Sequence, residues 1–209
     1  MNEVETGGEI KEFAEGILDQ TIEESLFYTI LNALKDRREE TRAWMMLRKL
    51  DTTKNATTSA QTLPVDCRNI RKIVVGGIEY TEIPFESQHL NQNSNVYYVD
   101  WANGTFTLCG TPSGSVYFYY IKTTDSITET TEPVWPKRFI KLLGFDVAGY
   151  IMNGQDADDL FARMSPENKG QAIAIENTMI TWDSNLQINA QGGRRGMEGI
   201  GGEEDIGIL

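Results

Sequence analysis

The sequence predicts an α+β protein: mainly a helical bundle, with a small antiparallel β subdomain inserted between its helices and a flexible C-terminal arm. Three observations predict this architecture. Apolar residues recur at helical spacing before residue 43 and again after residue 135. The segment between them contains short β-prone runs separated by glycine turns. Residues 191–209 contain seven glycines, and a segment of that composition cannot bury enough apolar surface to fold alone.

These patterns divide the chain into four predicted parts. Residues 9–43 form the N-terminal helices of the bundle, and residues 44–134 form the inserted β subdomain with its loops. Residues 135–188 return to the same bundle as its C-terminal helices, and residues 189–209 form the glycine-rich arm.

Two helices are predicted before the β subdomain. Apolar residues at helical spacing predict a short amphipathic helix over 9–18. Thr21 and Glu24 match a capping box, which predicts a second helix from about Ile22 to about Glu40. The end of this helix is dense in charges of both signs, typical of a solvated face with local ion pairs. An interface patch is the alternative, because arginine is favoured where protein surfaces meet.

The middle of the chain predicts antiparallel strands. A strand is expected to begin near Met46, and the strands 70–75 and 78–83 flank Gly76-Gly77. The strands 96–100 and 105–109 flank Asn103-Gly104, a stronger signal for a type I′ turn. The last strand, 115–122, is aromatic on both faces. Either both of its faces are covered, or one face meets a neighbour.

Three helices are predicted after the β subdomain. The first begins at Pro136, which suits a first turn, and ends at Asn153-Gly154. A short helix is expected over 156–164. Ser165-Pro166 predicts the start of the last helix, which is expected to end near Ser184.

Composition limits the classes of partner. The net charge of −12 argues against a protein that wraps nucleic acid, because phosphate contacts need a basic face. It is compatible with lining a channel through which DNA passes, where like charge discourages sticking. No apolar run approaches the roughly 20 residues of a membrane span, and the acidic N-terminus does not resemble a signal peptide. The sequence thus predicts a protein made in the cytoplasm.

The sequence offers no specific signal for an enzyme. His89, the single histidine, lies in a polar loop without a nucleophile motif beside it. Cys67 and Cys109 are predicted to be reduced, and with His89 they are spaced too evenly for a zinc site. The aspartates at 156–159 lack the glycine and closing glutamate of a calcium loop. We therefore predict no catalytic residue, no cofactor and no metal.

The order of several short motifs carries a resemblance that spans about residues 9–185. The motifs are Leu63-Pro64-Val65-Asp66, Ile70-Arg71-Lys72-Ile73, Tyr97-Tyr98, Phe106-Thr107-Leu108, Gly110-Thr111-Pro112, Tyr119-Tyr120-Ile121-Lys122 and Pro136-Lys137-Arg138-Phe139. In this order they resemble the head–tail connector (adaptor) proteins of tailed bacteriophages.

The resemblance implies a structural virion protein rather than an enzyme. It implies a head-to-tail adaptor ring, commonly of twelve copies, that joins the portal to the tail and continues the DNA channel. The implied partners are the portal protein, tail or nozzle proteins and other copies of the chain. DNA would pass through the lumen without sequence-specific binding, and no membrane is involved. The implied location is the virion neck, after assembly in the host cytoplasm.

Two sets of residues are predicted to make the contacts. The arm is expected to bind the portal or a neighbouring subunit, because the alternation of Ile206 and Ile208 suits a strand added to a sheet edge. A tail without a role is the alternative. The arm candidates are Arg194, Arg195, Ile200, Ile206, Ile208 and Leu209. The candidates for contacts between subunits are Arg37, Arg38, Arg42, Tyr117 and Tyr119.

A different class of function stays open. Aromatic residues expected on the surface of the β subdomain suggest a carbohydrate- or peptide-binding module held between helices. These residues are Tyr97, Tyr98, Trp101 and Tyr119. A module of this kind predicts a monomer that binds glycans.

Overall fold

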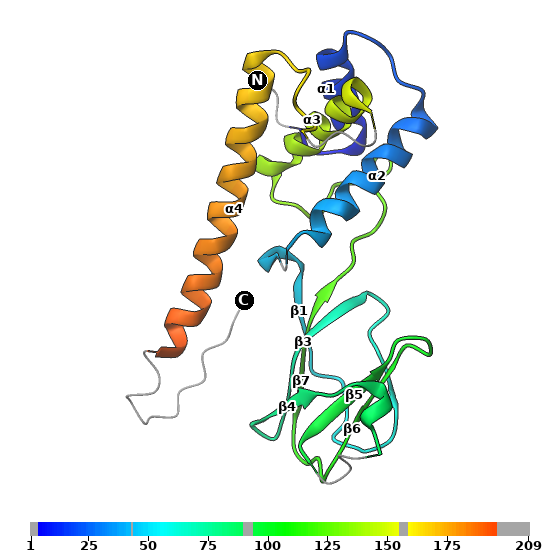
Figure 1. Cartoon of the computed structure of the whole chain (residues 1–209), viewed down its shortest axis with the longest axis vertical. Coiled ribbons are helices and arrows are strands. Elements are labelled where there is room, and N and C mark those ends of the chain that lie inside the picture. The colour runs from blue at the N-terminus through cyan, green and yellow to red at the C-terminus, as the bar shows by residue number, and fades with distance from the viewer. Residues whose placement is uncertain (1–3, 43, 90–93, 155–158, 196–209) are drawn as a thin grey trace. The chain divides into compact units, whose positions relative to one another are not determined.

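The computed structural model describes residues 4–42, 44–89, 94–154 and 159–195. It separates into two compact units (Figure 1). Residues up to Met46, together with those from Ser126 onward, form the helical unit. Residues Leu47–Asp125 form the β unit.

In the described part of the helical unit, four helices pack around one of their number, α3. They are α1 (Gly7–Leu18), α2 (Glu24–Glu40), α3 (Lys137–Asn153) and α4 (Pro166–Arg195). The stretch of α3 from Leu142 to Gly149 is buried at every position. Such a helix is apolar all round because neighbours cover every face, and α1, α2 and α4 each pack against it.

The cap of the first helix was not predicted, although Thr6 and Glu9 have the spacing of a capping box. Thr6 is the N-cap of α1, and its hydroxyl accepts a hydrogen bond from Glu9 N at 3.3 Å. The Glu9 carboxylate accepts from Thr6 N at 2.9 Å, which completes a capping box. Gly7 is required here because a Cβ would lie 2.0 Å from the carbonyl oxygen of Thr128.

The capping box expected at Thr21 is wrong. Ile22 N donates to the carboxylate of Glu15 on α1, so the chain is still in the connection at this point. Helix α2 begins at Glu24, and its N-cap is Glu23, whose carboxylate accepts from Ser25 N and Leu26 N. Sequence spacing predicted an N-cap two residues too early, and the contact between Ile22 and α1 is the reason.

Matched substitutions at these two threonines test the caps. Thr6→Ala is expected to lower the free energy of unfolding by about 1 kcal/mol, because the amide of Glu9 loses its acceptor. Thr21→Ala is expected to have almost no effect. Urea unfolding followed by circular dichroism measures both, and equal losses for the two variants would contradict the assigned caps.

The C-terminal helices differ from expectation in two ways. Gly154, at a φ of +86°, ends α3 as predicted, and Pro166 begins α4 as predicted, with Ser165 Oγ accepting from Asn168 N. Residues 160–163 form turns rather than the expected helix; residues 155–158 lie outside the described residues. Helix α4 continues to Arg195 instead of ending near Ser184, because no proline interrupts it.

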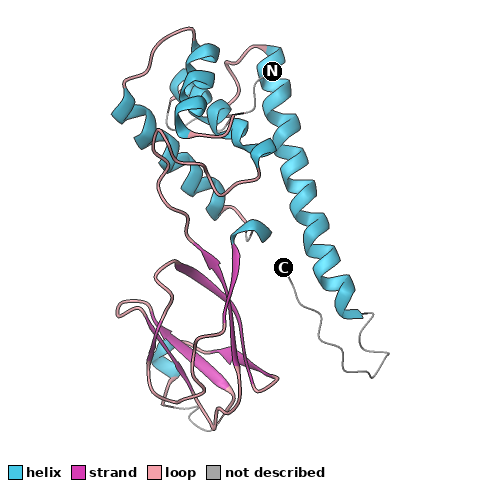
Figure 2. Cartoon of the chain, turned by 180° about the vertical axis from the view of Figure 1, so that it is seen from behind, coloured by secondary structure: helices cyan, strands magenta, loops and turns pink. Residues whose placement is uncertain are grey.

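Within the described residues, seven strands form the β unit, in the spatial order β1-β7-β3-β4-β5-β6-β2. Figure 2 shows the strands in magenta. They are β1 (Arg48–Asp51), β2 (Gln61–Thr62), β3 (Cys67–Val75), β4 (Ile78–Glu82), β5 (Val96–Asp100), β6 (Thr105–Leu108) and β7 (Val116–Lys122). Neighbours pair antiparallel except β4 and β5, which are parallel. The 3₁₀ turn η2 (Phe85–Ser87) lies in the connection between them.

The sheet curls into a half-barrel around its own core. We call β1, β7 and β3 the first wall, and β5, β6 and β2 the second wall; β4 joins them. Phe106 on β6 contacts Phe118 on β7 with ring centroids 5.0 Å apart, so the two walls enclose a common interior. Their outer faces therefore point away from each other.

The predicted fold class is wrong. The chain is 43% helical and 20% strand, and it is not mainly a helical bundle. The curled seven-stranded sheet has a core of its own and is not purely antiparallel. The two short strands β1 and β2 lie beside a polar, threonine-rich segment. Because their pairing depends on distant partner strands rather than on local pattern, the sequence predicted a smaller sheet than the one observed.

The hairpin signals were ranked in the wrong order. Gly76 and Gly77 both have positive φ, at +56° and +86°, in the two-residue turn between β3 and β4. Between β5 and β6 only Gly104 has positive φ. Asp100 accepts a hydrogen bond from Asn103 N at 3.1 Å, which closes a four-residue loop instead of the expected type I′ turn.

Candidate functional site

The part of the chain that the structure describes holds no group of three or more histidine, cysteine or acidic side chains placed to bind a metal ion. None of the helices within the described ranges is long and apolar enough to span a bilayer. What these residues do present are charged clusters, exposed apolar side chains and a hollow in the β unit.

Charge is divided unevenly between the two units. Residues 47–125, the β unit, contain seven basic and seven acidic residues. The whole net charge of −12 therefore belongs to the helical unit, which has twelve basic and twenty-four acidic residues. Many of these carboxylates are exposed, among them Glu12, Glu24, Asp36, Glu40 and Glu129. The helical unit consequently repels phosphate, and the β unit as a whole is neutral.

A buried arginine joins three helices of the helical unit. Arg38 on α2 donates Nε and Nη2 to the two carboxylate oxygens of Asp146 on α3, with Nη2 2.6 Å from Oδ1. Its Nη1 lies 2.7 Å from Oε1 of Glu176 on α4. Asp146 is completely buried. A bidentate pair of this geometry holds α2, α3 and α4 in one arrangement.

Burial and charge oppose each other in this cluster. Burial raises the pKa of the Asp146 carboxyl above its usual value, and the Arg38 guanidinium works against that rise. Burial lowers the pKa of Arg38, but its hydrogen bonds to Asp146 and Glu176 more than offset this and hold that pKa above its ordinary value. Arg38 is thus the charged partner that allows a carboxylate in the interior.

Arg42, two residues after the end of α2, forms a second ion pair with α4. Its Nε lies 3.1 Å from Oδ2 of Asp183, which is completely buried. The other oxygen of Asp183 accepts a hydrogen bond from Met45 N at 2.6 Å. Two of the arginines predicted to contact other subunits are therefore engaged within their own chain, whereas Arg37 is exposed. Contact of these arginines with another subunit stays a prediction.

Sequence reasoning missed the acidic partners of this cluster. Asp146 interrupts the apolar run from Leu142 to Ala148. A lone carboxylate in such a run is a usable signal, because charged residues are rarely buried without a partner. Glu176 and Asp183 gave no comparable signal.

The aromatic strand β7 has one face in the core and one face outward. Phe118 and Tyr120 point into the half-barrel and are almost completely buried. Tyr117 is 40% exposed and Tyr119 is half-buried on the outer face. Tyr119 lies opposite Leu50 of β1, which is 45% exposed. The two predicted contact tyrosines therefore share the outer face of the first wall, where a partner can reach them.

Three polar residues connect β1 and β7 to the residue directly before β3. Lys49 Nζ and the Tyr120 hydroxyl lie 2.9 Å and 2.8 Å from the two carboxylate oxygens of Asp66. Burial alone would raise the pKa of Asp66, but these two donors lower it below its ordinary value. Burial and the hydrogen bond to Asp66 raise the pKa of Tyr120 to about 12.

This triad predicts a pH dependence of stability. An unfolded tyrosine has a pKa of about 10, so the contribution of Tyr120 is fully present below that pH. It is lost as pH rises through the folded-state value of about 12. Unfolding free energies measured at pH 8 to 12 are expected to fall less steeply for Tyr120→Phe than for the wild type. Tyr117→Phe, on the exposed face of the same strand, is the control; identical curves for Tyr120→Phe and wild type would contradict the assignment.

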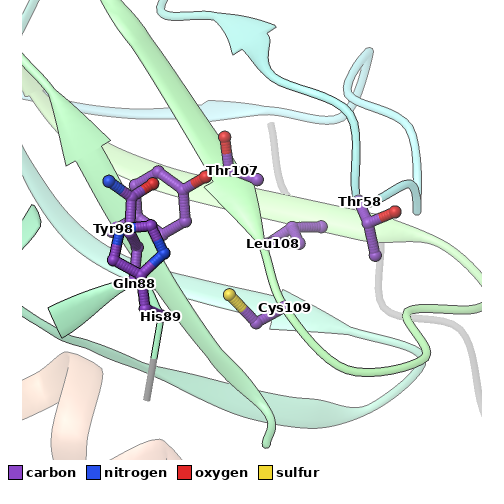
Figure 3. A pocket seen from close by; sticks show the side chains of 7 residues that line it. All are labelled: Thr58, Gln88, His89, Tyr98, Thr107, Leu108 and Cys109. Carbon is purple, nitrogen blue, oxygen red and sulfur yellow. The ribbon is translucent and has the colours of Figure 1, made fainter. Parts of the chain in front are cut away.

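A hollow of about 430 Å³ opens in the β unit beside β5 and β6 (Figure 3). Its lining residues are Thr58, Gln88, His89, Tyr98, Thr107, Leu108 and Cys109. Phe85 of η2 contacts Tyr98 edge-to-face at 5.7 Å and so supports one side. Burial raises the pKa of the Cys109 thiol, which favours the unreactive thiol form. His89 is exposed, as its polar loop suggested.

Cys109 and Tyr97 are buried, and Cys67 is partly buried. Cys67 and Cys109 are free, and burial raises the pKa of Cys67 to about 11. Tyr97 was expected on the surface with the other aromatics, but only 3% of it is exposed. Its hydroxyl donates to Glu82 at 3.1 Å. Trp101, at 51% exposed, does lie on the surface as expected.

The predicted arm residues fall largely outside the described part of the chain. Arg194 and Arg195 are the last two residues of α4. Ile200, Ile206, Ile208 and Leu209 lie outside the described residues. Binding through the arm stays a prediction.

Comparison with known proteins assigns the chain to a family. No curated protein matches it. A protein-family model described as SU10 adaptor protein matches residues 8–176, well over half of the chain. The resemblance carried by the order of the sequence motifs is confirmed by this match. The chain therefore belongs to the SU10 adaptor family of bacteriophage head–tail adaptors, structural proteins that interact with other components of the virion neck.

Proposed function

We propose that this adaptor forms a ring, commonly of twelve copies, that joins the portal to the tail and continues the DNA channel. The observation that carries the proposal is membership of the adaptor family. Contacts in such a ring are heterologous and close on themselves. The role requires binding surfaces and no catalytic group, so we propose a purely structural protein that takes no cofactor.

The division of charge supports this role. The helical unit carries the whole net charge of −12, and the β unit is neutral. An acidic surface beside passing DNA repels the phosphates, so the DNA slides during ejection rather than binding. We assign the channel-facing surface to the helical unit for this reason, and the contacts between copies to other surfaces.

The mass of the assembly tests the proposed function. Light scattering after gel filtration is performed on the full chain alone and on the full chain mixed with its portal protein. A ring, or a set of copies that joins the portal together, is the expected result. A monomer that ignores the portal would contradict the proposal.

The C-terminal arm is proposed to bind the portal or a neighbouring copy. Helix α4 ends at Arg195, so a deletion of residues 196–209 removes the distal arm and leaves the helix intact. Portal binding is expected to weaken in this variant. Substituting Arg194 and Arg195 with alanine in the full chain then separates the helix end from the residues that follow it. Unchanged portal binding in both variants would contradict the proposal that the arm binds the portal.

A second candidate function is a carbohydrate- or peptide-binding module. The observation that favours it is the hollow beside β5 and β6, which Tyr98 lines, in the same unit as the exposed Trp101. Aromatic faces of this kind stack on sugars and on extended peptides. A glycan array probed with the full chain is the test, with Tyr98→Ala and Trp101→Ala as controls for any hit. An array without hits counts against this candidate.

A further inference from the structure

The neutral β unit is strongly polarised along its sequence. Residues 47–72 and 122–125 contain all seven of its basic residues and three of its acidic residues. Residues 73–121 contain the other four acidic residues and no lysine or arginine. The first set carries a net charge of +4 and the second a net charge of −4. The unit is therefore neutral as a whole, but its positive and negative charges lie in different segments of the chain.

The fold gathers the basic residues on the first wall. Arg48 and Lys49 lie on β1, Lys122 lies at the end of β7, and Arg68, Arg71 and Lys72 lie on β3. These strands are adjacent, with Arg48 opposite Ile121 and Lys72 opposite Tyr119. Arg71 is exposed at a break in the β3–β7 register. Asp51 and Asp66 offset part of this charge through their pairs with Lys54 and Lys49.

The four acidic residues lie on β4, in η2 and at the end of β5; we call this the acidic side. Glu79 and Glu82 are on β4, which joins the walls, Glu86 is in η2, and Asp100 ends β5. Glu79 pairs with Lys72 at the junction of the two charge groups. Glu82 and Glu86 are exposed. The unit is thus basic on one side of its core and acidic on the other.

Each side also exposes large apolar side chains. Leu50 and Tyr117 are exposed on the first wall. Phe85 is exposed in η2, where its ring contacts Tyr98 of the hollow, and Trp101 is exposed directly after β5. Apolar anchors ringed by complementary charge are the usual composition of a specific interface.

We infer that neighbouring copies of this chain meet head to tail through their β units, with the first wall of one copy against the acidic side of the next, formed by β4, η2 and the end of β5. The inference rests on the proposed ring and names its contact surface. The occupant is a second copy because each β unit carries both a basic and an acidic set of residues, so the two sets are complementary between copies. A heterologous contact then places +4 beside −4 at every interface. This attraction opposes the mutual repulsion of the acidic helical units.

Altering the charge of the first wall and of the acidic side tests the inference. Arg48→Glu with Arg71→Glu reverses exposed charges on the first wall. Thr81→Lys with Glu86→Lys places two lysines on the acidic side, which changes its net charge from −4 to −1, and leaves the hydrogen bond between Tyr97 and Glu82 in place. Assembly of the full chain is measured by light scattering, alone and with its portal protein. Each double variant is expected to associate about tenfold or more weakly than wild type, because most of the charge attraction between the two sides is then lost.

Rescue distinguishes this contact from a folding defect. An equimolar mixture of the two double variants is expected to assemble, because the introduced glutamates of one copy then face the introduced lysines of the next. One chain with all four substitutions is expected to assemble for the same reason. Circular dichroism checks that each variant is folded. Wild-type assembly by both double variants, or failure of the mixture and of the quadruple variant to assemble, would overturn the inference.

A control on the helical unit separates this contact from net charge. Glu12→Lys with Glu24→Lys changes exposed residues of the helical unit in the same direction as the acidic-side variant, and it is not expected to weaken assembly. The outcomes also separate the two proposals. If both double variants still form the ring, the assigned contact surface is wrong, but the proposed adaptor function is not contradicted. A wild-type monomer that ignores the portal contradicts both.

Discussion

Replacing Arg38 with methionine is expected to lower the free energy of unfolding by about 3–5 kcal/mol, which is the cost of breaking a buried ion pair by removing one partner. The completely buried Asp146 would lose both of its guanidinium hydrogen bonds. Glu176 on α4 would lose its link to α2 at the same time. Urea unfolding monitored by the circular dichroism of the helices measures the loss.

Two further variants identify the cause. Arg37→Met removes an exposed arginine from the neighbouring position and is expected to have little effect. Arg38→Met combined with Asp146→Leu removes both charges and is expected to recover most of the loss, because no unpaired charge remains inside. Equal destabilisation by the single and the double variant would show that packing of the Arg38 stem, rather than its charge, is responsible.

The same variant has a defined pH dependence. Burial already raises the folded-state pKa of Asp146 above its unfolded value. Removal of Arg38 removes the group that opposes this rise, so the folded state binds a proton more readily than the unfolded state does. Stability of Arg38→Met is therefore expected to increase as pH falls toward 5, relative to the wild type. A constant difference between the two proteins from pH 8 to pH 5 would contradict this explanation.

Phe118→Ala is expected to lower the free energy of unfolding of the β unit by about 3–5 kcal/mol, the usual cost of removing a buried aromatic ring. Phe118 is completely buried and contacts Phe106 on the opposite wall and Tyr120 on its own strand. Its ring fills the space between the two walls. Tryptophan fluorescence and near-ultraviolet circular dichroism, with Trp101 in the β unit, follow the transition.

Tyr117→Ala is the matched control, because Tyr117 precedes Phe118 on β7 and points outward. It is expected to cost much less in stability. The helical unit has a separate core, so a transition of the α-helical signal at wild-type urea concentration is expected to persist in Phe118→Ala. Loss of both transitions together would contradict independent folding of the two units. Equal costs for the two substitutions would contradict the assigned faces of β7.

Much of the helical unit was predictable from local pattern. Apolar spacing placed α1 to within two residues of its start, and Gly154 and Pro166 ended α3 and began α4 as their backbone preferences require. Signals of this kind act between residues a few positions apart. The cap of α2 shows their limit, since contact of Ile22 N with Glu15 moved the helix start away from the expected residue.

The candidate surfaces were only partly predictable. Sequence pattern selected Tyr117 and Tyr119 as contact residues, and both share the outer face of β7. It also selected Arg38 and Arg42, which the fold engages with Asp146 and Asp183. An arginine that contacts another subunit and an arginine that pairs with a buried carboxylate of its own chain can have the same local sequence. Only the position of the opposing carboxylate distinguishes them.

The sequence by itself determined the membership of the adaptor family, the existence of the main helices and strands, and the total charge of −12. These depend on residue identity and on neighbours close in the chain. The tertiary structure alone decided the parallel pairing of β4 with β5, the separate half-barrel core and the division of charge into an acidic helical unit and a polarised β unit. Each of these depends on contacts between residues that are distant in the sequence, such as Arg38 and Asp146, which are 108 positions apart. A local sequence pattern does not specify which distant residue will be the partner.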